Sequence, residues 1–393
     1  MKVFQNNIPA FGFQRLPLWM FSTKVHLAFL TASFALLNTF LFRQLGIRVV
    51  NDSPRYLEYA ANMGTNGFYI DPHNIWYIGY SFFILGVRSV HDSLGAIVLA
   101  QYLFSFMGLI AVYFAAGKVT ANWLMALATA MLYLVFFEIS IYNSYILCES
   151  LFVSMNAICL YFLVNWYRGN RQWFYLVPGA LVLIYTVSIK PTGIALMGAM
   201  LALFIFFLWR RLGSAVLKTA FVGLVAIGFL VLVNRMLATY GMMNDYRLGE
   251  IVYGVSGFDQ SNFYPLLTVE RPEQLYLPGR SYGPLAQIVL FIGHHPLYWS
   301  KLFFGKLFYY FAHIRPYWSL WHNVYSVLLL VPLYGFAIKG MISFSPTARI
   351  FVLAFICIHA LSIGLTTVDW DGRFLLPLLP LLFVLAGKGV KGG

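Results

Sequence analysis

The sequence has few charged residues. Asp, Glu, Lys and Arg make up 10% of its 393 residues, against about 25% in an ordinary soluble domain. Hydrophobic residues make up 61%. A water-soluble chain of this size needs more charge to cover its surface, so a soluble globular domain and a disordered chain are both excluded. The composition is that of a polytopic membrane protein.

Cysteine is also scarce. Cys148, Cys159 and Cys357 all lie in or beside apolar runs. Their spacing fits neither a zinc site nor the disulfide framework of a small secreted domain. We interpret them as small buried hydrophobic residues. The sequence also lacks internal repeats, a Walker motif, low-complexity tracts and any stretch typical of an appended soluble domain.

Long apolar runs dominate what is present. Most approach the roughly 20 residues that cross a hydrocarbon core, although the last is short and contains two prolines. We therefore expect an all-α helical bundle of about ten transmembrane helices, forming one membrane-embedded domain over 1–393, with both termini on one side. The first run is too long for a cleaved apolar region, and no targeting peptide is evident. The runs are 24–42, 93–116, 121–137, 150–166, 173–188, 192–209, 215–233, 323–338, 348–365 and 374–386.

The residues behind the net charge of +13 are distributed unevenly between the two sides of the predicted bundle. If the 16-residue run 75–90 does not span, half of the 26 basic residues and none of the 13 acidic residues fall on the cytoplasmic side. If 75–90 spans, this separation is lost. The positive-inside rule therefore favours an interfacial helix at 75–90. The basic residues on that side are Lys2, Arg15, Lys24, Lys118, Arg168, Arg171, Arg210, Arg211, Lys218, Lys339, Arg349, Lys388 and Lys391.

The outer side then carries four polar segments, about 46–92, 138–149, 240–322 and 366–373. Helix packing alone does not require loops of this size. They indicate a site at the outer membrane interface with carboxylates and cations together. Carboxylates suit proton abstraction, and cations suit an anionic ligand such as a phosphate.

The first outer segment contains a helix start. Ser53 followed by Pro54 predicts a short helix that runs to about residue 63 and stops before Gly64. Asp52 precedes its N-terminus. Either Asp52 or Ser53 only caps this helix, or Asp52 is a functional carboxylate. Local chemistry alone leaves both interpretations open.

Five motifs in order along the chain resemble those of the GT-C superfamily, integral-membrane glycosyltransferases that include the lipid A aminoarabinose transferases and protein O-mannosyltransferases. The resemblance covers most of 24–390. It lies in Asp52-Ser53-Pro54-Arg55-Tyr56, Trp76-Tyr77-Ile78-Gly79-Tyr80, Leu147-Cys148-Glu149-Ser150, Lys190-Pro191-Thr192-Gly193 and Asp371-Gly372-Arg373-Phe374.

The sequence departs from that pattern in three places. Ser53 replaces the acidic residue that often follows the first Asp, and Glu149 stands where the family more often has Asp. The Lys-Pro-Pro turn is absent, and His73-Asn74 occupies that region. The sugar and the acceptor therefore stay undefined.

The resemblance implies a glycosyltransferase of glycan biosynthesis. It would move a sugar from a polyprenyl-phosphate-linked donor to a hydroxyl of a lipid or glycan acceptor, on the periplasmic or lumenal face. With a bacterial source the chain would lie in the inner membrane and act on the cell envelope. One attack on the anomeric carbon inverts its configuration, so an inverting enzyme is expected.

Within this resemblance, Asp52 is the candidate base. A carboxylate at a helix N-terminus is a weak base, which suffices if the proton leaves after most of the sugar–phosphate bond has broken. Glu149 is the second candidate catalytic carboxylate, with capping of the span 150–166 as its alternative. Glu138 is expected to lie outside the site.

Candidate substrate-binding residues follow from charge. Lys190 and Arg373 lie at outer span ends and are expected to hold phosphate, although Lys190 could instead extend to the interface. Arg373 could pair with Asp369 or Asp371. The first motif contributes Arg55 and Tyr56, and Arg55 could instead pair with Glu58.

The stretch 297–313 is too charged for a lipid-exposed span, and we expect an interfacial helix there. Its Lys301 and Lys306, with Arg315 beyond it, are further candidate donor contacts. The adjacent His294 and His295 do not converge on a helix and are not expected to bind metal. A divalent metal such as Mg²⁺ or Mn²⁺ at Asp52 is not favoured, because no Asp-x-Asp pair is present.

Two other classes stay open. A transporter or flippase would show paired halves and broken helices near the midplane. A non-catalytic assembly subunit for lipid-linked glycans would not need an interfacial Asp–helix motif. Membrane lipids are expected neighbours, and no nucleic-acid partner is expected.

Overall fold

The computed structural model describes residues 22–67, 72–168, 172–257 and 264–391. Over these residues the chain is all-α, and no strand forms. Isolated backbone bridges join Arg48 to Tyr145, Glu250 to Thr268 and Val252 to Val368. The expected all-α polytopic membrane bundle is therefore confirmed.

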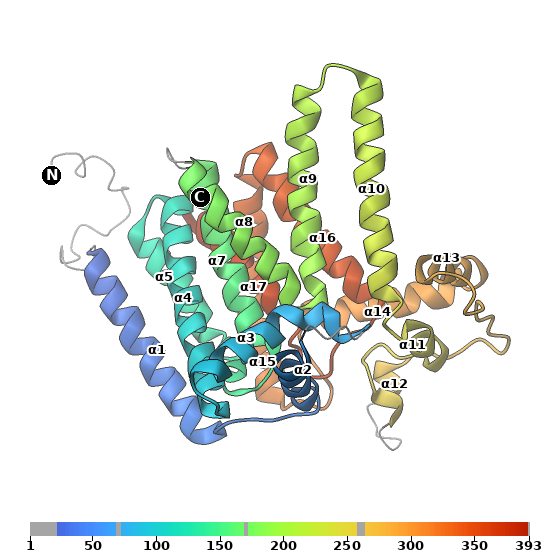
Figure 1. Cartoon of the computed structure of the whole chain (residues 1–393), viewed down its shortest axis with the longest axis horizontal. Helices are drawn as coiled ribbons and strands as arrows, with labels where there is room; N and C mark the ends of the chain where they lie inside the picture. Colours follow the sequence, from blue (N-terminus) through green and yellow to red (C-terminus); the bar gives the residue numbers. More distant parts are fainter. Residues whose placement is uncertain (1–21, 68–71, 169–171, 258–263, 392–393) are drawn as a thin grey trace.

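Seven described helices are long and apolar enough to cross a membrane. They are α1 (Thr23–Leu45), α4 (Leu94–Thr120), α7 (Cys148–Arg168), α9 (Ile194–Arg211, entered through η5, Pro191–Gly193), α10 (Ala215–Leu237), α15 (Leu320–Ile342) and α16 (Pro346–Leu365). No residue of the most apolar 18-residue window of α10 is buried inside the protein. The α9–α10 hairpin rises beyond the rest of the bundle, and α10 packs little against the other helices (Figure 1).

The other three expected spans have a different form. α5 (Trp123–Val135) ends at Phe136 and bends by 58° into α6 (Glu138–Ile141) and η4 (Tyr142–Ser144), and this pair can count as an eighth span. α8 (Gln172–Ile189) is a shorter apolar helix. At the C-terminal end, Pro377 and Pro380 divide the run into η7 (Leu376–Leu378) and α17 (Leu379–Lys391).

The start of α1, the end of α4 and the end of α17 lie close together. Near the start of α1, His26 Nδ1 bonds the Tyr113 hydroxyl at 3.0 Å. At the end of α17, Lys391 donates to the carbonyl of Thr120. Tyr113 and Thr120 both lie near the C-terminal end of α4. The first described helix therefore begins, and the last ends, on the same side of the bundle.

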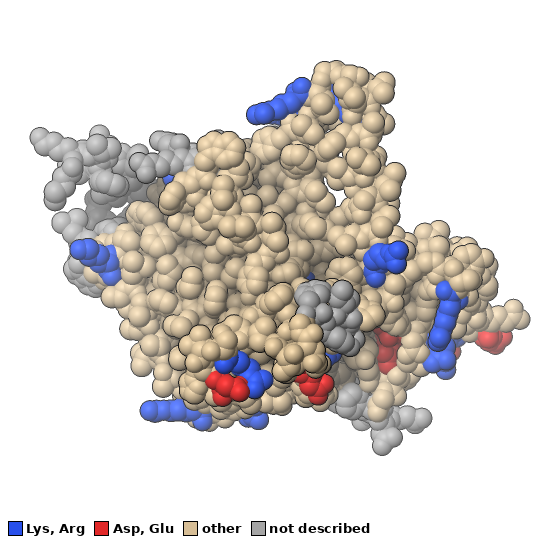
Figure 2. Space-filling model, viewed as in Figure 1, with Lys and Arg blue, Asp and Glu red and all other residues tan. Residues whose placement is uncertain are grey.

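The outer end carries short helices that do not span. α3 (Ile78–Val90), preceded by η3 (Asn74–Tyr77), and α14 (Pro296–Ala312) both lie across the bundle helices (Figure 1). These are the stretches that the sequence predicts as interfacial. The third outer segment adds α11 (Met242–Leu248), η6 (Val255–Gly257), α12 (Tyr264–Leu267) and α13 (Pro284–His294). On the face of the molecule shown in Figure 2, the acidic side chains gather at the end that carries these short helices. Basic side chains lie there too, and they also lie at the tip of the α9–α10 hairpin.

The first outer helix is longer than the sequence predicts. α2 (Ser53–Asn66) continues through Gly64 and ends before Gly67. A Cβ at Gly64 would lie 2.9 Å from Leu85 Cδ1, so α2 lies close against α3 there. This tertiary contact outweighs the local tendency of glycine to end the helix.

Loops far apart in the sequence are joined at the outer end by backbone hydrogen bonds. Arg48 N–H donates to the Ser144 carbonyl at 2.9 Å, and Ile146 N–H donates to the Arg48 carbonyl at 2.9 Å. Tyr253 N–H donates to the Val368 carbonyl at 2.9 Å. These bonds tie the first segment to the second and the third to the fourth.

A buried amide fixes the helices beneath these loops. Asn143 Nδ2 donates to Asn38 Oδ1 at 3.0 Å and to Ser105 Oγ at 3.1 Å, and Ser150 Oγ donates to Asn143 Oδ1 at 2.6 Å. The side-chain amide is thus satisfied by α1, α4 and α7. A fully bonded polar group of this kind specifies one packing of the bundle.

Candidate active site

Asp52 stands before the first turn of α2, but its side chain does not cap the helix. The hydroxyl of Ser53 instead accepts the Val50 N–H at 2.9 Å. The Asp52 carboxylate faces two guanidinium groups. Its Oδ2 accepts from Arg373 Nη2 at 3.0 Å, and its Oδ1 lies 3.5 Å from Arg55 Nη2.

Arg373 contacts all three carboxylates of the site. Its Nε lies 3.5 Å from Glu149 Oε1 and 3.4 Å from Asp371 Oδ1, in addition to the bond to Asp52. Burial opposes the charged form, but Glu149 and Asp371 outweigh it and raise the pKa of Arg373 well above its ordinary value. The guanidinium is therefore a permanent cation that connects the first, second and fourth outer segments.

Glu149 and Lys190 form a buried ion pair. Lys190 Nζ donates to Glu149 Oε1 at 2.8 Å, and both side chains are at most 4% exposed. Glu149 lies in the first turn of α7, and Lys190 precedes η5 in an extended conformation. The Lys190 ammonium also lies 4.6 Å from the ring centroid of Phe374. Lys190 does not extend to the interface, and Glu149 faces a cation at the helix start.

Arg55 lies at the edge of the site. Its Nη2 donates to the Tyr56 hydroxyl at 3.2 Å, and its guanidinium lies over the rings of Tyr56 and Tyr77 at 5.0 and 4.9 Å. Burial raises the pKa of Tyr56 well above its usual value, so the phenol stays neutral. Arg55 pairs with Asp52, whereas Glu58 on the same helix is exposed.

The site is balanced in charge but not in hydrogen bonding. Carboxylates at Asp52, Glu149 and Asp371 face cations at Arg55, Lys190 and Arg373. The Nε atoms of Arg55 and Arg373 are nevertheless buried without a hydrogen-bond partner among the described residues. Arg373 Nε has the carboxylates of Glu149 and Asp371 at 3.5 and 3.4 Å, whereas Arg55 Nε is the donor better suited to an anionic ligand such as a phosphate.

The two candidate catalytic carboxylates differ in access. The Asp52 side chain is 34% exposed, whereas that of Glu149 is 2% exposed and held by Lys190. A hydroxyl that enters from the outer face can reach Asp52 but not Glu149. Of the two carboxylates, Asp52 is therefore the accessible one, and Glu149 is buried against Lys190.

An apolar cavity of about 280 Å³ begins at this cluster. Lys190, Phe374, Tyr77 and Tyr240 line one part of it, and the rest is lined mainly by apolar side chains of α9, α10 and α16. A separate apolar cavity of about 130 Å³ lies near Val119 and Arg168, where α4 and α7 end. None of the described residues that line it is acidic, so we give it no part in the site.

Three predicted donor contacts lie outside the cluster. Lys301 is exposed on α14. Lys306 is fully buried and donates to the Thr366 carbonyl at 2.5 Å. Arg315 is 1% exposed, and its guanidinium donates to the carbonyls of Tyr309, Ile314 and Asp369 at 2.8 to 2.9 Å. Lys306 and Arg315 therefore bond to the protein's own backbone.

Some site residues were not singled out from the sequence. Tyr77 lies inside one of the family-like motifs without a predicted role, and Asp371 begins another motif and is predicted only as a possible partner of Arg373. Tyr240 carried no signal, because only the fold brings the end of α10 next to the first outer segment. Aromatic rings are too common in this chain for one of them to stand out.

Comparison with known proteins supports the fold. No model of a known protein family matches the sequence, and no curated protein matches it. Among solved structures, ArnT from Cupriavidus metallidurans bound to undecaprenyl phosphate is similar, with a TM-score of 0.50 and 15% identity. The match covers 94% of this chain and 60% of that chain.

At 15% identity the likeness concerns the fold alone. The chain therefore has a fold similar to that of ArnT, and it is an integral membrane protein. It spans about 60% of the length of the ArnT chain.

Proposed function

We propose that this protein is an integral-membrane glycosyltransferase. It transfers a sugar from a polyprenyl-phosphate-linked donor to a hydroxyl of a lipid or glycan acceptor, with inversion at the anomeric carbon. The active site lies at the outer end of the bundle. With a bacterial source, this end faces the periplasm from the inner membrane, and the product is part of the cell envelope.

One observation carries the proposal: a solvent-accessible carboxylate and two partly unsatisfied guanidinium groups lie together beside an apolar cavity. Asp52 bonds Arg373 at 3.0 Å, and Arg55 and Arg373 each retain a buried Nε without a hydrogen-bond partner. A lipid-linked sugar phosphate has the matching parts. Its hydroxyl-bearing sugar needs water-facing polar groups, its phosphate needs cations and its prenyl chain needs an apolar groove.

The chemical step is a single displacement. The acceptor hydroxyl oxygen forms a bond to the anomeric carbon while the bond from that carbon to the phosphate oxygen breaks. The phosphate leaves with the electron pair as polyprenyl phosphate, and the hydroxyl proton passes to Asp52. Since the phosphate is already a good leaving group, a weak carboxylate base suffices, and positioning supplies most of the rate.

Arg373 and Lys190 would stabilise the departing phosphate. Lys190 lines the cavity and is positioned by Glu149, and Arg373 connects the phosphate position to Asp52. The prenyl chain would follow the apolar wall from Phe374 toward α10 and reach lipid along the exposed hairpin. We expect no divalent metal at Asp52, because two guanidinium groups already face its carboxylate.

The test is transfer of labelled sugar by purified full-length protein in nanodiscs. A panel of radiolabelled polyprenyl-phosphate sugars is offered with membrane-extract acceptors to the wild type, Asp52→Asn and Glu58→Gln. Glu58 lies on the same helix but is exposed. We expect a labelled product with the wild type and with Glu58→Gln, and a loss of about 10²–10⁴-fold with Asp52→Asn.

Two outcomes would contradict the proposal, one in part and one in whole. Equal transfer by the wild type and Asp52→Asn would remove Asp52 from catalysis but keep the activity. Binding of donor without transfer from any sugar of the panel would favour a transporter, a flippase or an assembly subunit for lipid-linked glycans.

A further inference from the structure

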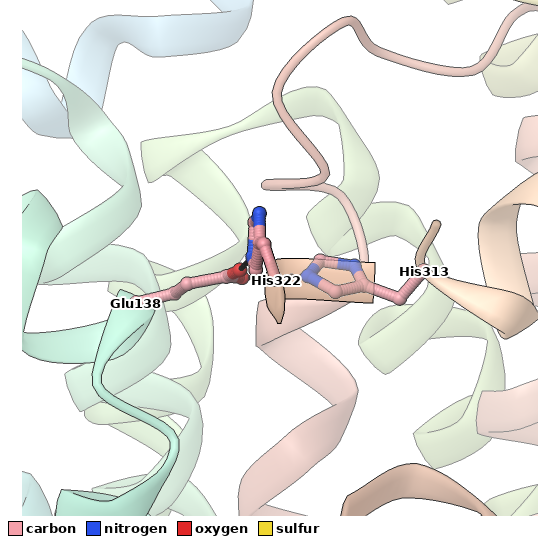
Figure 3. A group of neighbouring side chains, drawn as sticks. All are labelled: Glu138, His313 and His322. Carbon is pink, nitrogen blue, oxygen red and sulfur yellow. Dashed lines mark hydrogen bonds and ion pairs between the residues drawn. The ribbon is translucent and has the colours of Figure 1, made fainter. Parts of the chain in front are cut away.

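A second cluster of polar side chains lies apart from Asp52. Glu138 of α6, His313 at the C-terminal end of α14 and His322 in the first turn of α15 point toward one another (Figure 3). Glu138 Oε2 lies 2.6 Å from His313 Nε2, and Glu138 Oε1 lies 2.6 Å from His322 Nε2. One ligand atom from each residue falls within 4.8 Å of the others.

We propose that Glu138, His313 and His322 bind a divalent transition metal ion, with zinc as the ion that the donor set fits best. Two imidazole nitrogens and one carboxylate oxygen are a zinc ligand set that leaves one coordination position for water. The evidence for metal binding does not depend on the transferase proposal, because none of the three residues lines the cavity beside Asp52.

Charge supports a cation at this place. The Glu138 and His313 side chains are 7% and 1% exposed, so the carboxylate is largely removed from water. Within the described residues its ion-pair partners are the two histidines, and neither Lys nor Arg contacts it. With both imidazoles neutral, the cluster would carry an uncompensated buried negative charge, which is costly. Either a metal ion or a proton on one imidazole must supply the positive charge.

The surroundings hold the imidazoles toward the carboxylate. His313 has a left-handed backbone conformation, with φ of 51° and ψ of 45°, which a residue with a Cβ rarely adopts. The His322 ring stacks on Trp318 at a centroid distance of 4.3 Å, and its backbone N–H bonds the Ser319 hydroxyl at 3.2 Å. Such support of ligand orientation is typical of metal sites.

The cluster must open slightly to admit the ion. In a tetrahedral zinc site with bonds of about 2.0 Å, neighbouring ligand atoms lie about 3.3 Å apart. With Glu138 Oε2 as the ligand, its distance of 2.6 Å to His313 Nε2 must lengthen by about 0.7 Å. His322 Nε2, which faces the other carboxylate oxygen at 2.6 Å, must turn toward the ion. His322 is 25% exposed and lies at a helix start, so its side chain has room for this movement.

The metal would stabilise the loop that carries Arg373 without touching the substrate. A Cβ at Gly372, the residue before Arg373, would lie 2.5 Å from His313 Cε1. The imidazole of His313 therefore packs directly against the backbone of that loop at Gly372. By joining α6, the turn after α14, and α15, the ion would hold this imidazole, and with it the loop, in place. Its role is to position Arg373, not to react.

The experiment measures metal binding by the full-length protein in detergent. Chelator-treated wild type, His322→Ala, Glu138→Gln and His91→Ala are titrated with Zn²⁺ by calorimetry, and bound zinc is counted by mass spectrometry. His91 is an exposed histidine outside the cluster. We expect one zinc per chain for the wild type and His91→Ala, and binding at least about tenfold weaker for the two cluster variants. Zinc should also raise the melting temperature of the wild type but not of His322→Ala.

Wild-type protein loaded with Co²⁺ provides a readout that needs no variant to fold. We expect the strong visible absorption of a four-coordinate Co²⁺ ion with nitrogen and oxygen ligands. Folded wild-type protein that binds no zinc and shows no such absorption would overturn the proposal. Zinc binding unchanged by both cluster variants would overturn it as well. The first result would mean that a proton alone balances the charge of Glu138.

Discussion

Arg373 Nη2 donates to Asp52 Oδ2 at 3.0 Å across 321 residues of sequence. The same guanidinium also faces Glu149 and Asp371. One planar group thus sets the distances among three carboxylates from separate outer segments. An ammonium group cannot do so, because it lacks the fork of donors in fixed directions.

Replacement of Arg373 by lysine should therefore harm the site although the charge is kept. We expect sugar transfer by Arg373→Lys to fall about 10²-fold, because an ammonium cannot reach Asp52, Glu149 and Asp371 together in the directions that the guanidinium donors fix. The measurement is the labelled-donor assay. Arg247→Lys is the matched control, since Arg247 is exposed on α11. Wild-type rates for Arg373→Lys would mean that only charge matters here.

The buried ion pair of Glu149 and Lys190 predicts that the effects of their substitutions on stability are strongly coupled. Lys190→Met or Glu149→Gln alone leaves the partner buried without its counter-ion, and we expect each to lower stability by about 3–5 kcal/mol. The double variant should recover much of this loss while transfer stays low. Thermal unfolding of the four proteins in detergent measures the coupling. Strictly additive losses would argue against a direct interaction.

Lys306 should be dispensable for chemistry. Burial lowers its pKa to about 8, and it donates to the Thr366 carbonyl, not to a group at the candidate site. Lys306→Met leaves the neighbouring Asp245 and Glu250 without this cation and should lower stability. We expect sugar transfer per folded protein to stay within about threefold of wild type, because Lys306 lies outside the site. A large loss of sugar transfer with an unchanged melting temperature would indicate that Lys306 contacts the donor after all.

Helix packing predicts a stability effect at Gly389. A Cβ there would lie 1.9 Å from the Phe336 carbonyl oxygen, so α15 and α17 are in contact through backbone atoms. Gly389→Leu should force them apart and cost several kcal/mol, beyond the ordinary range of about 1–3 kcal/mol for overpacking. Gly335→Ala, with open space around its Cβ position, should be nearly neutral. Melting temperatures of both variants provide the comparison.

Much of the site could be predicted from the sequence, for a physical reason. In a chain this apolar, a carboxylate or cation at the end of an apolar run needs a partner, because leaving water is costly. Glu149, Lys190 and Arg373 each stand at such an end, and the structure brings them together with Asp52, which precedes the first outer helix.

The metal cluster could not be predicted in the same way. Its convergence depends on the left-handed turn at His313 and on the path from α14 into α15. Both are tertiary features, and neither follows from local propensity or spacing. The continuation of α2 through Gly64 has the same origin, since contact with α3 decides it.

The wide separation of Asp52 and Arg373 has a consequence for biogenesis. A chain that enters the membrane as it is synthesised places Asp52 at the outer surface early, whereas Arg373 comes near the end. Glu149 and Lys190 can pair in between, but the guanidinium that joins them to Asp52 arrives only with the last helices. A nascent or truncated chain therefore has no partial active site. Under the transferase proposal, donor lipid is therefore not consumed before insertion is complete.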